Sequence, residues 1–307
     1  MLRLLDCLSL PGDADKPNED SFAHNESAAL VVDGATMLGD PLMPGPSDAA
    51  WIAQFGARRL MAHLQDQEPK KALRSAMADA EKSFKALRRR EMEEPWQLPC
   101  ASVMLVADAQ TRLPLRAKPG KGEVAAAGSA LARVASESRR GLEFMWLGDC
   151  GAILQQANTV TVVGETMAKR GEESGRARKM AQEKKVSSAA PGVRTQFMTH
   201  LRAARARINS GDYWLFTPDK RAAAHAQRRI VKIEPGALLL LASDGFLALA
   251  SDYGAYDAAG LIAAAKSKGL AVLGEELRAI ENDDAGGDRF ARFKKSDDAT
   301  ALLLEIQ

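Results

Sequence analysis

The chain of 307 residues has few of the side chains on which several protein classes depend. Its three cysteines, Cys7, Cys100 and Cys150, lie far apart, and no Cys-x-x-Cys pair occurs. Neither a disulfide framework nor a thiolate zinc site is therefore indicated, and a reducing cytoplasm fits best. Aromatic residues make up 5% of the chain, too few to suggest stacking surfaces for single-stranded nucleic acid.

An excess of charge of either sign is also missing. The chain has 42 Lys and Arg against 40 Asp and Glu, so binding of nucleic acid through bulk positive charge is not expected. It has no run of about 20 uncharged apolar residues, so we expect no membrane span. Asp6 interrupts the apolar N-terminus, which predicts a strand and not a signal peptide. We therefore expect a cytoplasmic protein that does not act on membranes.

Apolar residues make up 46% of the chain, enough for a sizeable core, and their spacing predicts many short strands. Helical spacing begins after Ser47 and again at Pro69, where the second helix runs to about Glu94. Further helices are predicted at Asp257–Lys268 and Leu270–Asn282. The predicted strands are Leu2–Leu10, Ala28–Val32, Ala101–Ala107, Leu142–Leu147, Ala152–Gln155, Val160–Val163, Tyr213–Phe216, Ile230–Ile233, Ala237–Ala242 and Ala301–Ile306. Strands that do not alternate regularly with helices favour an α+β fold with antiparallel sheets and helices outside them.

Two segments lack this patterning. Residues 112–140 are rich in glycine, alanine and lysine, and residues 164–194 are highly charged and contain several glycines. Both are predicted to be long exposed loops. We find no internal repeat, so a single domain over residues 1–307 is the simplest organisation.

Five short segments place acids beside the ends of predicted strands. Each alone is most simply a turn, because Asp-Gly after a strand is a common turn signal. Should the acids converge, their carboxylates would repel one another unless cations lay between them. Oxygen ligands suit magnesium, manganese or calcium, and the lack of Cys and His clusters disfavours zinc. The segments are Asn18-Glu19-Asp20, Val31-Val32-Asp33-Gly34, Leu147-Gly148-Asp149, Ala242-Ser243-Asp244-Gly245 and Ser296-Asp297-Asp298-Ala299-Thr300.

In their order, these segments resemble the motifs of the type 2C metal-dependent (PPM) serine/threonine protein phosphatases, and the chain looks like a divergent bacterial member. The resemblance runs over about residues 18–306. It implies a four-layer αββα sandwich, in which helix pairs flank two central antiparallel sheets. The implied reaction is hydrolysis of phosphoserine or phosphothreonine in a protein, by water that two Mn²⁺ or Mg²⁺ ions activate. A third, weaker ion site and an opposing serine/threonine kinase are also implied.

The resemblance assigns roles residue by residue. Asp33 would bridge two ions, the Gly34 carbonyl would bind one of them, and Asp20 would orient the attacking water. Glu19 would act near the second ion through water, and Asp149 resembles the acid of the third site. The implied metal ligands are Glu19, Asp33, Gly34, Asp149, Asp244 and Asp297, and the implied catalytic residues are Asp20, Asp33 and Asp244.

Two departures from the family pattern concern the phosphate and the leaving group. The family usually has an arginine five residues before Asp20, where this chain has Asp15 followed by Lys16. Lys16 is predicted to bind phosphate as a point charge, the alternative being a solvated loop lysine. After Gly34 the family often has a histidine, where this chain has Ala35. A general acid is thus missing, and we expect alkyl phosphates to be hydrolysed more slowly than aryl phosphates.

Two other functions stay open on the sequence. One is a phosphatase-like regulatory module that binds phosphoproteins with weak or no turnover, which the two departures favour and the retained acids oppose. The other is a hydrolase for small phosphomonoesters, which would differ only in the shape of its cleft. The basic stretch from Arg202 to Arg207 either flanks that cleft or forms a solvated surface.

Overall fold

Two antiparallel sheets form the centre of the computed structural model, which describes residues 1–109, 141–164, 166–184, 186–190 and 193–307. Sheet I has the order β1-β10-β9-β6-β7, and these strands span Leu2–Leu10, Ala299–Ile306, Leu238–Ala242, Gly151–Gln156 and Thr159–Val163. Sheet II has the order β2-β3-β4-β5-β8, and these strands span Asp20–His24, Ala28–Gly34, Ala101–Asp108, Gly141–Leu147 and Gln227–Lys232. Every neighbouring pair runs antiparallel.

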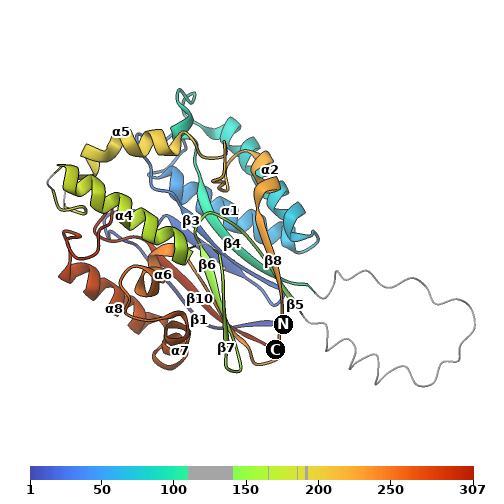
Figure 1. The fold of residues 1–307 in the computed structure, drawn as a ribbon. Coiled ribbons are helices and arrows are strands. Elements are labelled where there is room, and N and C mark those ends of the chain that lie inside the picture. The colour runs from blue at the N-terminus through green and yellow to red at the C-terminus, as the bar shows by residue number, and fades with distance from the viewer. Residues whose placement is uncertain (110–140, 165, 185, 191–192) are drawn as a thin grey trace, which may run out of the picture.

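Helices cover the outer face of each sheet (Figure 1). Helices α1 (Asp48–Leu64) and α2 (Pro69–Leu87) pack on sheet II. Helices α6 (Asp244–Ser251), α7 (Ala258–Lys268) and α8 (Leu270–Asp283) pack on sheet I. This order of helix, sheet, sheet and helix confirms the predicted four-layer αββα sandwich.

Strand β3 shows why the central strands are apolar at successive positions. Its Leu30 and Val32 pack with the α1 and α2 layer, whereas Ala29 and Val31 pack between the two sheets. Successive side chains of a strand point to opposite faces, and both faces of this sheet are covered. The chain therefore buries three apolar layers, one between the sheets and one beneath each set of helices.

The start of α1 was readable from the sequence because its cap is local. The Ser47 hydroxyl accepts a hydrogen bond of 3.1 Å from the Ala50 amide, which satisfies one of the free donors of the first turn. Helix α2 begins at Pro69 as predicted but ends at Leu87, short of the predicted end near Glu94. The short 3₁₀ helix Pro95–Gln97 follows it.

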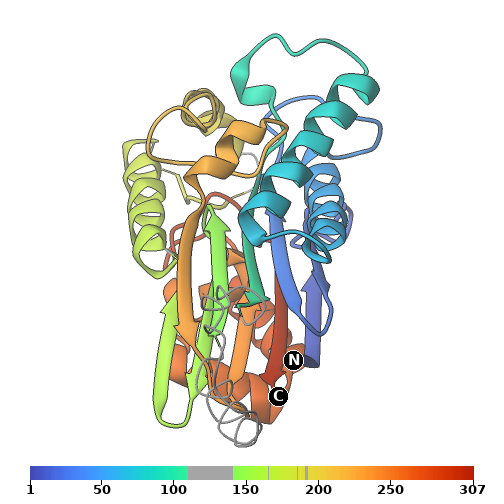
Figure 2. The ribbon, with the colours of Figure 1, turned by 90° about the vertical axis from the view of Figure 1, so that its right-hand side faces the viewer.

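The predicted loop over residues 164–194 is wrong for most of its length. Residues Thr166–Lys184 form helix α4, and Val193–Arg205 form helix α5, at one end of the sandwich (Figures 1 and 2). Helix α4 consists largely of Lys, Arg, Glu, Ala and Met, which favour helices intrinsically even where no apolar stripe marks one. The predicted loop over 112–140 lies outside the described residues, which omit 110–140.

The predicted strand Tyr213–Phe216 is also wrong, since only Phe216 pairs, in an isolated bridge to Ala101. The 3₁₀ helix Lys220–His225 follows this segment and leads into β8. Among the described helices, none is long and apolar enough to cross a lipid bilayer.

Candidate active site

Three of the predicted acids meet at one end of the sandwich. Asp33 lies near the end of β3, Asp149 lies two residues after β5, and Asp244 begins α6 two residues after β9. One carboxylate oxygen of each lies within 4.8 Å of those of the other two. Strands β3 and β5 belong to sheet II and β9 to sheet I, so the cluster joins the two sheets.

Asp20 lies beside this cluster and is buried. It pairs with Asp33 in the β2–β3 ladder, so the two acids are neighbours across the sheet edge. Its Oδ2 accepts a hydrogen bond of 2.8 Å from the hydroxyl of Ser243, the residue that follows β9 of sheet I. Its Oδ1 is buried with no hydrogen-bond partner among the described residues. An unpartnered buried carboxylate oxygen is costly, and a water molecule or cation in the cluster would satisfy it.

The remaining acids of the five segments divide between the cluster and its support. Asp297 lines the same cavity as Asp33 and forms an ion pair with Lys294. The next residue, Asp298, instead accepts hydrogen bonds from the amides of Gly12 at 2.6 Å and Glu19 at 2.7 Å. Asp298 therefore holds the segment that leads into β2, and only Asp297 faces the cavity.

Glu19 is positioned by the start of helix α1. Its Oε1 accepts a hydrogen bond of 2.6 Å from Ser47, and its carbonyl accepts one of 2.8 Å from the Gly34 amide. Glu19 thus lies next to Gly34, whose carbonyl is a predicted metal ligand. Lys16 does not line the cavity. Its side chain is 73% exposed, and its ammonium group lies 2.8 Å from the Asp13 carboxylate.

A glycine allows Asp149 to approach the cluster. Gly148 has a φ of +78°, and a β-carbon there would lie 2.2 Å from the Ser102 hydroxyl. That hydroxyl donates a hydrogen bond of 2.5 Å to Asp149 Oδ1. Ser102 pairs with Asp33 in the β3–β4 ladder, so this contact fixes Asp149 against the strand next to Asp33.

The electrostatics of the cluster indicate a place for cations. Burial raises the pKa of Asp33 well above its usual range, and the nearby carboxylates of Asp244, Asp20, Asp297 and Asp149 raise it further. Burial likewise raises the pKa of Asp20 to about 8, opposed by the Ser243 hydrogen bond and assisted by Asp297. These carboxylates repel one another and offer only oxygen atoms as ligands, which is the type of site that binds Mn²⁺ or Mg²⁺.

A cavity of about 760 Å³ opens onto the cluster. Its walls include helix α5 and the segment that follows Gly34. Several basic side chains line it, and they come from α4, α5, the segment after α5 and the segment before β10. These are Arg176, Arg194, Arg205, Arg207, Arg292 and Lys294. The basic stretch from Arg202 to Arg207 therefore flanks the cavity in part, through Arg205 and Arg207.

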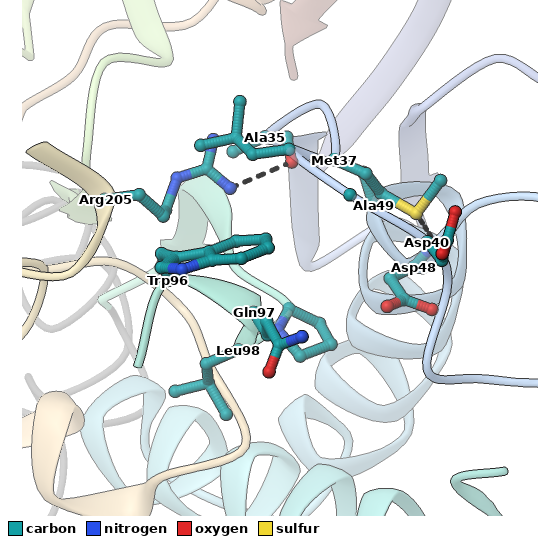
Figure 3. Close-up of a pocket in the computed structure, with 12 residues that line it drawn as sticks. Ala35, Met37, Asp40, Asp48, Ala49, Trp96, Gln97, Leu98 and Arg205 are labelled. Carbon is teal, nitrogen blue, oxygen red and sulfur yellow. Dashed lines mark hydrogen bonds between the residues drawn. The ribbon is translucent and has the colours of Figure 1, made fainter. Parts of the chain in front are cut away.

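Helix α5 also fixes the segment after Gly34. Arg205 donates hydrogen bonds to the carbonyls of Ala35 and Thr36, and Arg202 donates to that of Leu38 at 2.7 Å while lying over Trp96. Figure 3 shows the Arg205–Ala35 contact at a second cavity, of about 20 Å³, beside Trp96. That volume suits about one water molecule, so of these two cavities the larger one has room for a substrate.

The sequence interpretation missed the roles of four residues that the structure brings to the site. Ser102 and Ser243 stood within or beside recognised segments, but a serine next to a strand end has no local signal for an acid elsewhere. Arg194 and Lys294 belong to charged segments that were interpreted as loops or left unassigned. Only the tertiary arrangement brings them to the cavity.

The comparisons agree with this fold. The model of the protein phosphatase 2C family matches residues 13–268. The solved serine/threonine phosphatase PstP/Ppp of Mycobacterium tuberculosis is similar at a TM-score of 0.54 and 15% identity, covering 100% of this chain and 99% of that one. No curated protein sequence matches the chain.

Two further solved structures share the architecture. The photosystem II phosphatase PBCP is similar at a TM-score of 0.55 and 13% identity, covering 100% of this chain and 99% of that one. The serine/threonine phosphatase of S. agalactiae is similar at a TM-score of 0.51 and 11% identity, covering 100% of both chains. These identities show a common fold, and the family model spans most of the sequence. The chain belongs to the protein phosphatase 2C family.

Proposed function

We propose that this protein, as a single catalytic domain over residues 1–307, hydrolyses phosphoserine and phosphothreonine in proteins with two Mn²⁺ or Mg²⁺ ions and a third, weaker one. The observation that carries the proposal is the convergence of Asp33, Asp149 and Asp244 within 4.8 Å. When bound, such ions would acidify a water molecule and neutralise phosphoryl charge, which is the main need of phosphate-ester hydrolysis.

The chain's own residues would divide the work by position. Asp33, with Asp244 and Asp297, would hold the ions between the sheets, and Asp149 would supply the weaker site. The Gly34 carbonyl would bind one of the ions. Glu19, whose carboxylate is held by Ser47, would act near the second ion through water. Asp20 would orient the attacking water through Oδ1, the oxygen that has no partner among the described residues.

Substrate class and compartment belong to the same proposal. A cavity of about 760 Å³ with several arginines at its wall suits a phosphorylated protein segment, whose dianionic phosphate would be attracted to them. Such a substrate implies an opposing serine/threonine kinase. The free cysteines Cys7, Cys100 and Cys150 support a reducing cytoplasm.

The test is hydrolysis of para-nitrophenyl phosphate and of a phosphothreonine peptide, with Mn²⁺, with Mg²⁺ and with chelator. We expect metal-dependent turnover of both, abolished in Asp33→Asn and Asp244→Asn. We expect a smaller rate on the peptide, because no histidine follows Gly34 to protonate an alkoxide leaving group. Equal rates on the two substrates would contradict the expected effect of the missing general acid. Turnover that chelator does not reduce would contradict a metal-dependent mechanism.

One observation favours a second candidate, a regulatory module that binds phosphoproteins without turnover. Lys294 forms an ion pair with Asp297 and so competes with an ion for that carboxylate. Metal binding without turnover on either substrate would select this candidate.

A further inference from the structure

Two basic side chains of the larger cavity, Lys294 and Arg194, lie close enough to the acid cluster to be given a more specific role than general attraction of phosphate. Lys294 lies three residues before Asp297, and Arg194 lies in the first turn of α5. Both line the cavity that opens onto the acid cluster. Both also interact electrostatically with Asp297, although they come from segments about 100 residues apart.

Lys294 is held between the acid cluster and the segment after Gly34. Its ammonium group pairs with Asp297 and donates a hydrogen bond of 3.2 Å to the Thr36 hydroxyl. Its side chain is 32% exposed and lines the cavity. An ion bound to Asp297 would weaken this ion pair and leave Lys294 with a positive charge to be balanced.

Arg194 has an even less complete set of partners. Within the described ranges it makes no hydrogen bond or ion pair, although it is half-buried. By contrast, the guanidinium of Arg205 is engaged with the carbonyls of Ala35 and Thr36. A half-buried guanidinium that makes no hydrogen bond to any described residue suits an anionic ligand that presents two oxygens.

These contacts concern the phosphate-binding role that the sequence interpretation gave to Lys16. That lysine pairs with Asp13 at 2.8 Å and does not line the cavity. Lys294 lies in the segment before β10 and Arg194 lies on α5, and both line the cavity. Lys294 carries a positive charge, and Arg194 adds the planar fork that can bind two phosphoryl oxygens.

We propose that Lys294 and Arg194 form the phosphate subsite of the cavity and bind the phosphoryl oxygens of the substrate that face away from the metal ions. This subsite rests on the proposed function, since it lies beside the proposed metal ligands. Its ligand class is a phosphate monoester dianion, and its product is inorganic phosphate.

The test is calorimetric titration of inorganic phosphate into the full chain saturated with Mn²⁺. Lys294→Met and Arg194→Met each remove one charge-assisted hydrogen-bond donor, and we expect phosphate to bind about 10- to 100-fold more weakly. Lys294→Arg keeps the charge and is expected to restore most of the affinity. Lys295→Met changes the exposed neighbour of Lys294 and serves as the matched control, with unchanged affinity.

Two measurements separate binding from structure. Mn²⁺ titration and urea unfolding of each variant show whether the metal site and the fold are intact. A loss of phosphate affinity in Lys294→Met at full Mn²⁺ occupancy, with the KM for para-nitrophenyl phosphate raised in parallel, supports the subsite. Unchanged phosphate affinity in both Met variants would overturn it, as would a loss in Lys16→Met alone. Absence of phosphate binding to the Mn²⁺-loaded wild type would overturn it as well.

Phosphate binding does not require turnover, so the two proposals fail separately. Weaker phosphate binding in the variants of a protein without phosphatase activity would refute the proposed function and keep the subsite. Metal-dependent turnover with unaltered phosphate binding in those variants would keep the function and refute the subsite.

Discussion

Ser243 donates a hydrogen bond of 2.8 Å to Asp20, and this contact joins the two sheets at the acid cluster. Asp20 begins a strand of sheet II, and Ser243 follows β9 of sheet I. The same hydroxyl accepts a hydrogen bond of 2.9 Å from the Thr300 amide of β10. One buried hydroxyl therefore satisfies a carboxylate and a backbone amide from different parts of the chain.

Ser243→Ala should lower the free energy of unfolding by about 1–3 kcal/mol, because it leaves the Asp20 carboxylate and the Thr300 amide without this partner. Urea denaturation of the Mn²⁺-free protein measures the change. Ser267→Ala is the control, since Ser267 is exposed on α7 and its hydroxyl bonds, among the described residues, only to carbonyls of its own helix. Equal effects of the two substitutions would contradict the account.

The fold was predictable where burial repeats locally. In β3 and β9 nearly every residue is apolar, because both faces of each central strand are covered. Helix α4 was missed because its charged sequence has no apolar stripe, and α6 because its residues after Gly245 are almost wholly apolar and extend the pattern of β9. Neither sequence shows the helical spacing of apolar and polar residues from which a helix is predicted.

The acid cluster was predictable only in part, for a related reason. The order of Asp33, Asp149 and Asp244 along the chain matched a family pattern, and the structure brings these three together. Which basic side chains face these acids depends on how α5 and the segment before β10 cross the end of the sandwich. Lys294 and Arg194 carry no local sign of that crossing, whereas Lys16 lay near Asp20 in sequence alone.

The metal-free protein should lose stability as pH rises. Burial raises the pKa of Asp20 to about 8, above the value of about 3.9 in the unfolded chain. Between these two values the folded state holds a proton that the unfolded state has released, so stability falls with pH across this window. Asp33, whose pKa is raised in the same direction, adds to the fall. Thermal unfolding from pH 4 to pH 9 in chelator measures it, and Mn²⁺ should flatten the slope. A flat profile in chelator would contradict this electrostatic description.

Gly148→Ala should destabilise the protein more than a matched glycine substitution elsewhere. Gly148 and Gly236 have similar φ values, +78° and +81°, so alanine costs about 1–2 kcal/mol of backbone strain at each. Only at Gly148 would the new β-carbon meet an atom, the Ser102 hydroxyl at 2.2 Å. We expect a further loss of about 1–3 kcal/mol for Gly148→Ala, measured by urea denaturation. Similar losses at both positions would show that the Ser102–Asp149 contact tolerates displacement.

The three thiols should differ in reactivity. Cys7 is exposed, whereas Cys100 and Cys150 are buried. Burial raises the pKa of both buried thiols, and the Asp33 carboxylate raises that of Cys150 further. Because the thiolate is the reactive form, an aromatic disulfide reagent should modify one thiol in the native protein and three in urea. Rapid modification of more than one native thiol would show that the layer between the sheets opens to solvent.

The central claim is that acids from both sheets bind divalent cations together, and a calorimetric titration of Mn²⁺ into chelator-stripped protein tests it most directly. We predict that two or more ions bind per chain and that Asp33→Asn abolishes this binding, because a carboxylate oxygen of Asp33 lies within 4.8 Å of one from Asp149 and one from Asp244. Circular dichroism and urea unfolding of this variant verify that it folds. Absence of Mn²⁺ binding to the wild type, or binding that Asp33→Asn leaves unchanged, would contradict the account.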